Sequence, residues 1–141
     1  MSEHRFVFPV RVYYEDTDAS GVAYHANYLR WFERARTEWL RALGMGQEAL
    51  RVDANVAFTV ANLEIAFRRP ARLDDLLEVV TRVPQVRRAS LVFEQELLRP
   101  ADGELLARAQ ARVGCVSAAD FRPAALPDEM FVAIGRWSQG L

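Results

Sequence analysis

Apolar residues between positions 27 and 43 recur at steps of three and four, and charged residues fill most of the positions between them. This spacing predicts one long amphipathic helix. Gly44 follows where a left-handed C-terminal cap is expected. The apolar stripe is broad and aromatic, so we expect a curved sheet to wrap around the helix. Its members are Tyr28, Leu29, Trp31, Phe32, Ala35, Trp39, Leu40 and Leu43.

The rest of the chain mostly alternates between apolar and polar residues, which is typical of strands. One strand is predicted over residues 5–14, where Pro9 favours an edge position. A polar connection at 47–55 has room for one more helical turn. Turn residues separate the later strands, so consecutive strands are expected to pair as a meander. These four strands are predicted at 56–69, 76–83, 89–98 and 104–116, and the tail at 118–141 is predicted as coil and a short helix.

These elements predict an α+β fold in which an antiparallel sheet of about five strands wraps around one long central helix. The chain has 141 residues, a length that fits a single domain, and we place that domain at 1–141. An open sheet has two edges, and exposed edges seek partners. We therefore expect a homo-oligomer, either a dimer or a tetramer built from dimers.

Composition excludes several classes of protein. Hydrophobic residues make up 51%, charged residues 26%, and the net charge is -1, so no basic excess is available to bind nucleic acid. The single Cys115 excludes an internal disulfide and a multi-cysteine zinc site, and its apolar surroundings predict a small buried side chain. No leader pattern or apolar run of about 20 residues occurs. We expect a cytoplasmic protein with no stable membrane insertion, no metal and no cofactor.

The segment before the long helix is where chemistry is expected. Asp16 and Asp18, a Gly21 turn and His25 crowd into ten residues directly ahead of the helix. Two carboxylates one residue apart on an extended segment point to opposite sides, so only one of them can face a pocket. Asp16 is therefore expected to hold the loop through hydrogen bonds. Asp18 taken alone is also compatible with a turn or capping aspartate.

The run Asp16-Thr-Asp18-x-x-Gly21-Val-x-Tyr-His25-Ala-Asn27-Tyr-Leu29, followed by Glu33-Arg-Ala-Arg-Thr-Glu38, resembles the hotdog-fold acyl-CoA thioesterases. More narrowly, it is similar to the 4-hydroxybenzoyl-CoA thioesterase family and its Tol-Pal-associated acyl-CoA thioesterase branch. The similarity extends from about residue 10 to 127. Ser20 and Ala23 stand where this branch is expected to carry Gly and Val.

The resemblance implies an enzyme that hydrolyses acyl-CoA to free acid and CoA. It gives Asp18 the central catalytic role, as general base or as nucleophile. It also puts His25 in the site, to protonate the departing thiolate or polarise the carbonyl, and Tyr14 near Asp18. The backbone N–H of His25, close to the helix start, is the candidate donor to the developing oxyanion. Packing alone would equally account for Tyr14 and His25.

For the CoA part of the substrate, the resemblance implies Arg87, Arg88 and Ser90, since arginine suits phosphate geometry. Arg122 and the pair at 68–69 are further candidates, and solvated surface arginines are the plain alternative. Three other functions stay open at this point: an acyl-carrier-protein thioesterase, a dehydratase on the same fold, and a non-catalytic acyl-CoA binding module. Short aliphatic, long aliphatic and aromatic acyl groups all remain open.

Overall fold

The central helix has the predicted position. In this computed structural model, which describes residues 4–140, α1 covers Ala26–Ala42. Gly44, two residues after the last helical residue, has a φ of 89°, which is left-handed and favours glycine. The buried face of α1 is largely aromatic, as the stripe predicted: Tyr28, Trp31, Phe32, Ala35, Trp39 and Leu40.

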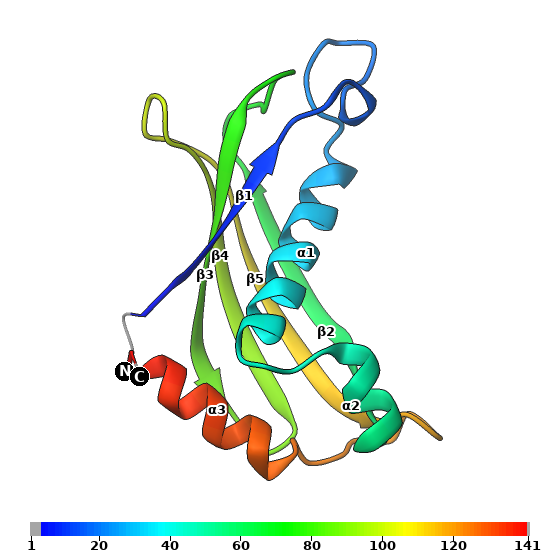
Figure 1. Cartoon of the computed structure of the whole chain (residues 1–141). Coiled ribbons are helices and arrows are strands. Elements are labelled where there is room, and N and C mark those ends of the chain that lie inside the picture. The colour runs from blue at the N-terminus through cyan, green and yellow to red at the C-terminus, as the bar shows by residue number, and fades with distance from the viewer. Residues whose placement is uncertain (1–3, 141) are drawn as a thin grey trace.

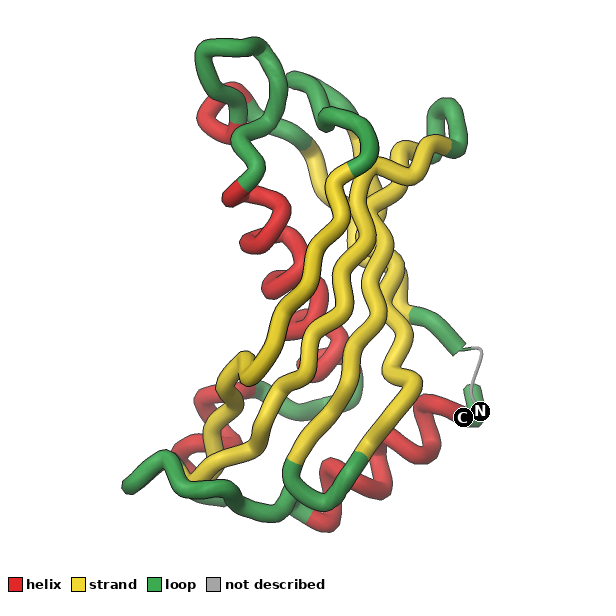
Figure 2. Tube along the Cα trace, turned by 180° about the vertical axis from the view of Figure 1, so that it is seen from behind, coloured by secondary structure: helices red, strands yellow, loops and turns green. Residues whose placement is uncertain are grey.

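Five strands form one antiparallel sheet in the order β1-β3-β4-β5-β2, and α1 lies against its concave face (Figure 1). Seen from behind, the opposite face carries no helix across the middle of the strands (Figure 2). The α+β fold with a five-stranded sheet is confirmed. The strands are β1 (Phe6–Arg11), β2 (Val56–Phe67), β3 (Leu76–Val86), β4 (Ser90–Arg99) and β5 (Glu104–Ser117).

The predicted meander is correct only for β3, β4 and β5. β2 pairs with β5 at the far edge, and β1 occupies the place beside β3. β2 does not pair with β3 because the connection between them is too long for a tight hairpin and is hydrogen-bonded to β5 and α1. Arg68 and Arg69 donate their N–H groups to Leu106 of β5, and Ala71 is bound to α1. The connection therefore crosses the end of the sheet.

Two strand ends differ from the prediction. β1 stops at Arg11 because the chain turns into a single 3-10 turn, η1 (Tyr14–Asp16). β3 continues through Pro84 to Val86, three residues beyond the predicted end at residue 83. A register shift against β4 lies at this point, and β1 pairs no further along β3 than Thr81. A proline is tolerated there because the strand is bulged on one side and unpaired on the other.

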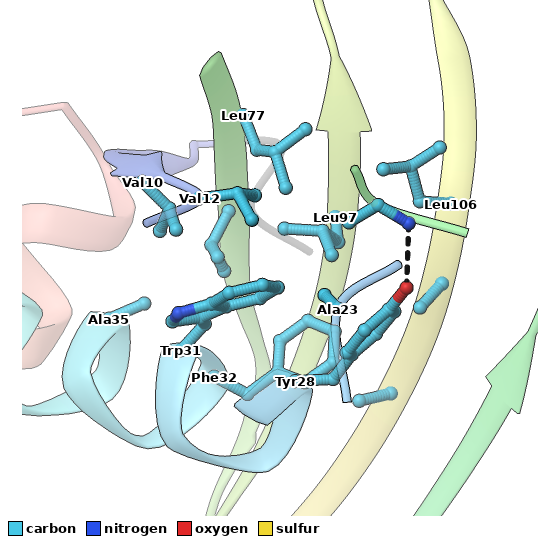
Figure 3. Packing of buried hydrophobic residues seen from close by; sticks show 14 residues of the cluster. Val10, Val12, Ala23, Tyr28, Trp31, Phe32, Ala35, Leu77, Leu97 and Leu106 are labelled. Atoms are coloured by element: carbon cyan, nitrogen blue, oxygen red, sulfur yellow. Dashed lines mark hydrogen bonds between the residues drawn. The ribbon is translucent and has the colours of Figure 1, made fainter. Parts of the chain in front are cut away.

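The core lies between α1 and the sheet, and Figure 3 shows how the aromatic rings of α1 meet the strands. The amide of Gln95 on β4, 1% exposed, donates to the Phe32 carbonyl and to the Thr81 hydroxyl, both at 3.0 Å. Arg36 donates to the same amide at 2.9 Å. Burial lowers the pKa of Arg36, against the opposing charge of Glu33. This network fixes where α1 lies along the sheet.

Two shorter helices close the other end of the sheet. α2 (Gln47–Asp53) follows the cap of α1 where one helical turn was expected. The tail contains α3 (Asp128–Ser138), which buries Met130 and Ile134 against the core and confirms the predicted short helix. Residues 118–127 carry no helix or strand. The single domain predicted at 1–141 reaches beyond the described residues at both ends and stays a prediction.

Candidate active site

Asp16 organises the loop that leads from β1 into α1. Its carboxylate accepts the N–H of Tyr13 at 2.9 Å, and its carbonyl accepts the N–H of Tyr24 at 2.8 Å. The same carbonyl accepts the side-chain amide of buried Asn27 at 2.9 Å. The prediction that Asp16 holds the loop is confirmed. Its supporting premise was wrong, because Asp16 lies in η1 and not on an extended segment.

A tight turn follows at residues 18–21. The N–H of Asp18 donates to Val22 and its carbonyl accepts from Gly21, both at 3.0 Å. Gly21 has a φ of 85°, and no atom lies within 4 Å of the place a Cβ would occupy. Glycine is therefore required here for backbone conformation and not for space.

The loop is bound to the β2–β3 connection through Ala71. The Ala71 N–H donates to the hydroxyl of Tyr28 at 2.8 Å, shown as the dashed line in Figure 3, and its carbonyl accepts from Ala23 at 2.8 Å. Val22 and Arg72 form a further β-bridge. Ala71 is fully buried, and burial raises the pKa of Tyr28, so the phenol stays neutral at physiological pH.

The carboxylate of Asp18 is exposed and bound to its own turn. Its Oδ1 accepts the Ser20 N–H at 2.9 Å and also the Ser20 hydroxyl. These hydrogen bonds, and in smaller part the charge of His25, hold the pKa of Asp18 below its usual value. Both of these donors come from Ser20, a position that the sequence marked only as a departure from the branch.

His25 immediately precedes α1 and is exposed at the surface. Its ring lies 4.6 Å from the Tyr24 ring and 6.1 Å from the Phe67 ring, centroid to centroid. A cavity of about 260 Å³ forms beside it, lined by His25, Tyr28, Phe67, Arg68, Arg69 and Pro70. Within residues 4–140, no hydrogen bond engages the backbone N–H of His25. That N–H is thus available at the positive end of the α1 dipole.

Tyr14 lies in η1 with 82% of its surface exposed. Its carbonyl accepts the Thr17 hydroxyl at 2.7 Å, while its own hydroxyl has no hydrogen-bond partner in the described part of the chain. Tyr14 therefore stands at the outer rim of the loop and does not contact Asp18.

Arg87, Arg88 and Ser90 lie at the turn between β3 and β4. The loop at 14–25 adjoins the beginning of β3, whereas this turn follows its end. The two are separated by about 36 Å, at roughly 3.3 Å per residue over the 11 residues of β3. Both arginines are exposed. One chain therefore does not bring the predicted CoA residues to Asp18 and His25.

Other candidate chemistry is limited. Cys115 is buried, as predicted, and desolvation raises the pKa of its thiol, which disfavours the reactive thiolate. Over residues 4–140, no three His, Cys, Asp or Glu side chains gather in a way that could hold a metal ion. No helix in that range is long and apolar enough to cross a membrane.

A five-stranded antiparallel sheet around one long helix, with an Asp and a His on the loop before that helix, defines the class of hotdog-fold thioesterases. The chain belongs to the Thioesterase-like superfamily, which it matches over residues 12–134.

Curated relatives agree with this assignment. The acyl-CoA thioesterase YbgC of Haemophilus influenzae is 48% identical over 133 residues, which cover 94% of this chain and 96% of the relative. The acyl-CoA thioester hydrolase YbgC of Escherichia coli O157:H7 is 47% identical over 127 residues, which cover 90% of this chain and 93% of the relative. Both confirm the prediction of a thioester hydrolase.

A solved structure confirms the fold. Slr0204, a 1,4-dihydroxy-2-naphthoyl-CoA thioesterase from Synechocystis, superimposes with a TM-score of 0.86 at 27% identity. The match covers 93% of this chain and 96% of the Synechocystis chain.

Proposed function

We propose that this chain hydrolyses acyl-CoA thioesters to a free acid and CoA, with Asp18 as the general base. The observation that carries the proposal is the loop at 14–25, which holds an ionised carboxylate, an imidazole and an unengaged N–H at the start of α1. The names of the relatives at 47–48% identity support acyl-CoA as the substrate class.

In the proposed reaction, Asp18 takes a proton from a water molecule whose oxygen attacks the thioester carbonyl carbon. The carbonyl oxygen becomes negatively charged and accepts the N–H of His25, where the dipole of α1 also stabilises it. The carbon–sulfur bond then breaks, and the CoA thiolate takes up the proton that Asp18 removed from water, relayed through the imidazole of His25. Tyr14, at the rim, contacts the substrate at the entrance.

Direct attack by Asp18 is the other route to the same products. It would give a mixed anhydride that water then hydrolyses. A single turnover in ¹⁸O-labelled water separates the two routes. General-base catalysis puts the label only in the released acid, so label in the carboxylate of Asp18 requires nucleophilic attack and hydrolysis of the anhydride at the Asp18 carbonyl.

We propose that a dimer completes the site through the free edge of β2. The opposite edge, β1, is short and contains Pro9, which makes it a poor pairing edge. β2 is 12 residues long and carries no proline. Antiparallel pairing of two β2 edges would put the β3–β4 turn of the second copy at the same end as the first copy's loop. Arg87, Arg88 and Ser90 of that copy would then bind the CoA phosphates.

The test is release of free thiol from a panel of acyl-CoA thioesters by the purified full-length chain, beside the same acyl groups on acyl carrier protein. Faster turnover on the CoA thioesters supports the proposal. Preference for the carrier thioesters, or acyl-CoA binding without thiol release, contradicts it. Light scattering tests the dimer and a tetramer built from it. The cytoplasmic location and the Tol-Pal association stay predictions.

A further inference from the structure

Arg99, the last residue of β4, binds two carboxylates close to the loop at 14–25. Its Nη1 donates to Oδ2 of Asp75 at 3.1 Å, while its Nε and Nη2 lie 3.0 and 2.9 Å from Oδ2 of Asp102. These hydrogen bonds, first to Asp102 and then to Asp75, hold the pKa of Arg99 above its usual value. The side chains of Arg99 and Asp75 are only 15% and 21% exposed. A shielded network of this kind is stronger than an isolated surface ion pair.

Asp75 closes a turn at 72–75 that precedes β3. Its Oδ2, the atom that Arg99 binds, also accepts the Arg72 N–H at 2.9 Å, and the Asp75 N–H donates to the Arg72 carbonyl at 3.1 Å. Asp74, within the turn, has a φ of 71°, which is unfavourable for a residue with a side chain. Such a conformation persists only where surrounding contacts fix it. The carboxylate of Asp75 supplies one of these contacts, and Arg99 fixes that carboxylate.

The turn at 72–75 is in turn bound to the loop at 14–25. Arg72 forms a β-bridge with Val22, and the Val22 carbonyl accepts the N–H of Asp18 at 3.0 Å. The β4–β5 turn, the start of β3 and the loop before α1 lie at the same end of the molecule (Figure 1). A continuous path of contacts therefore leads from the end of β4 to the backbone of Asp18.

We propose that Arg99 is a positioning residue for hydrolysis: through the turn at 72–75, it keeps Asp18 where the carboxylate can activate water. This inference rests on the proposed thioesterase activity. The carboxylate of Asp18 is exposed, and within residues 4–140 its hydrogen bonds go to Ser20 of the same turn. The place of that turn relative to the sheet therefore depends on backbone contacts such as the one to Val22. A misplacement of about 1 Å in a catalytic group can cost roughly 100-fold in rate.

The test compares Arg99→Ala with Arg82→Ala in steady-state hydrolysis of acyl-CoA, at a temperature where circular dichroism shows both variants folded. Arg82 is the matched control because it also lies on a strand and pairs with a carboxylate across the sheet, that of Glu96 at 3.4 Å. We expect Arg99→Ala to lower kcat by roughly 10–100-fold with KM within about twofold of the parent. Arg82→Ala should keep both constants within about twofold.

Two further measurements separate positioning from a general loss of stability. Millimolar guanidinium chloride should raise the kcat of Arg99→Ala several-fold and leave Arg82→Ala unchanged, because the ion can occupy the place between the two carboxylates. Arg99→Lys keeps a cation without the planar fork and should retain part of the parent kcat. Asp75→Asn tests the path from its other side and does not depend on whether Arg99→Ala folds. Combined with Arg99→Ala, it should add little to the larger single loss, since the two residues act as one unit.

Hydrogen exchange measures the hold on the loop without any turnover. The N–H groups of Asp18 and Ala23, which donate to Val22 and Ala71, should exchange roughly tenfold faster in Arg99→Ala than in the parent. An unchanged kcat in folded Arg99→Ala, an equal loss in Arg82→Ala, or an additive loss in the double variant would overturn the positioning role. If the parent hydrolyses no acyl-CoA, the proposed function fails instead, and the exchange rates alone decide whether Arg99 holds the loop.

Discussion

The substitution Tyr28→Phe isolates one hydrogen bond between α1 and the β2–β3 connection. The phenol oxygen accepts the Ala71 N–H at 2.8 Å, and both residues are buried. The phenylalanine ring can keep the stacking on Trp31 and the edge contact with Phe67, whose centroids lie 5.3 Å away in each case. The variant therefore removes an acceptor and little else.

The loss of stability comes from the Ala71 N–H, which has no acceptor in this variant. A buried N–H without an acceptor loses about 1–3 kcal/mol, the desolvation penalty of that group. Ala71 is fully buried, so water does not reach its N–H without local opening. We expect Tyr28→Phe to lower the free energy of unfolding by about 2 kcal/mol. Turnover should also fall, since Ala71 holds the loop at 14–25, which we propose to be catalytic, through Ala23.

Urea unfolding monitored by circular dichroism measures this loss as a shift of the midpoint at unchanged slope. Tyr24→Phe is the matched control, because its ring is half-exposed and its hydroxyl has no hydrogen-bond partner within residues 4–140. It should change stability by less than about 0.5 kcal/mol. Equal effects of the two substitutions would refute the assigned role of the Ala71 contact.

Three further predictions concern the loop and the CoA residues. Ser20→Ala removes a donor that lowers the pKa of Asp18, so the pKa rises and the acid limb of the kcat/KM–pH profile moves to higher pH. Gly21→Ala should cost about 1 kcal/mol in urea unfolding, because φ is 85° while space is free. Arg87→Ala and Arg88→Ala should raise KM for acyl-CoA several-fold with kcat retained, in steady-state assays; an unchanged KM would exclude both from CoA binding.

Local signals predicted most of the elements. The three- and four-residue periodicity placed α1 within one residue at each end, and Gly44 has the left-handed conformation that its cap position required. Asp16 holds the loop as expected, although the expectation assumed an extended segment where the structure has η1. These features depend on residues close in sequence.

The misplaced features depend on distant contacts. β2 pairs with β5 because the connection after it is bound by Leu106 and Tyr28, neither of which is near in sequence. β3 continues through Pro84 because the pairing of β1 with β3 extends no further than Thr81. The alternation of residues along one strand does not show where the pairing with a neighbouring strand stops. The separation of Arg87 from Asp18 follows from the length of β3 and the position of both turns. The motif predicts where the site lies, and tertiary pairing decides which residues can share it.

The most direct test of the account compares Asp18→Asn with Asp16→Asn. Each substitution removes one negative charge and keeps a side-chain oxygen that can accept a hydrogen bond. The account predicts that Asp18→Asn lowers kcat/KM for acyl-CoA by roughly 10²–10⁴-fold, the range of a lost general base, while Asp16→Asn stays within a few-fold. If Asp18→Asn hydrolyses acyl-CoA as fast as the parent, the carboxylate of Asp18 does not carry the reaction.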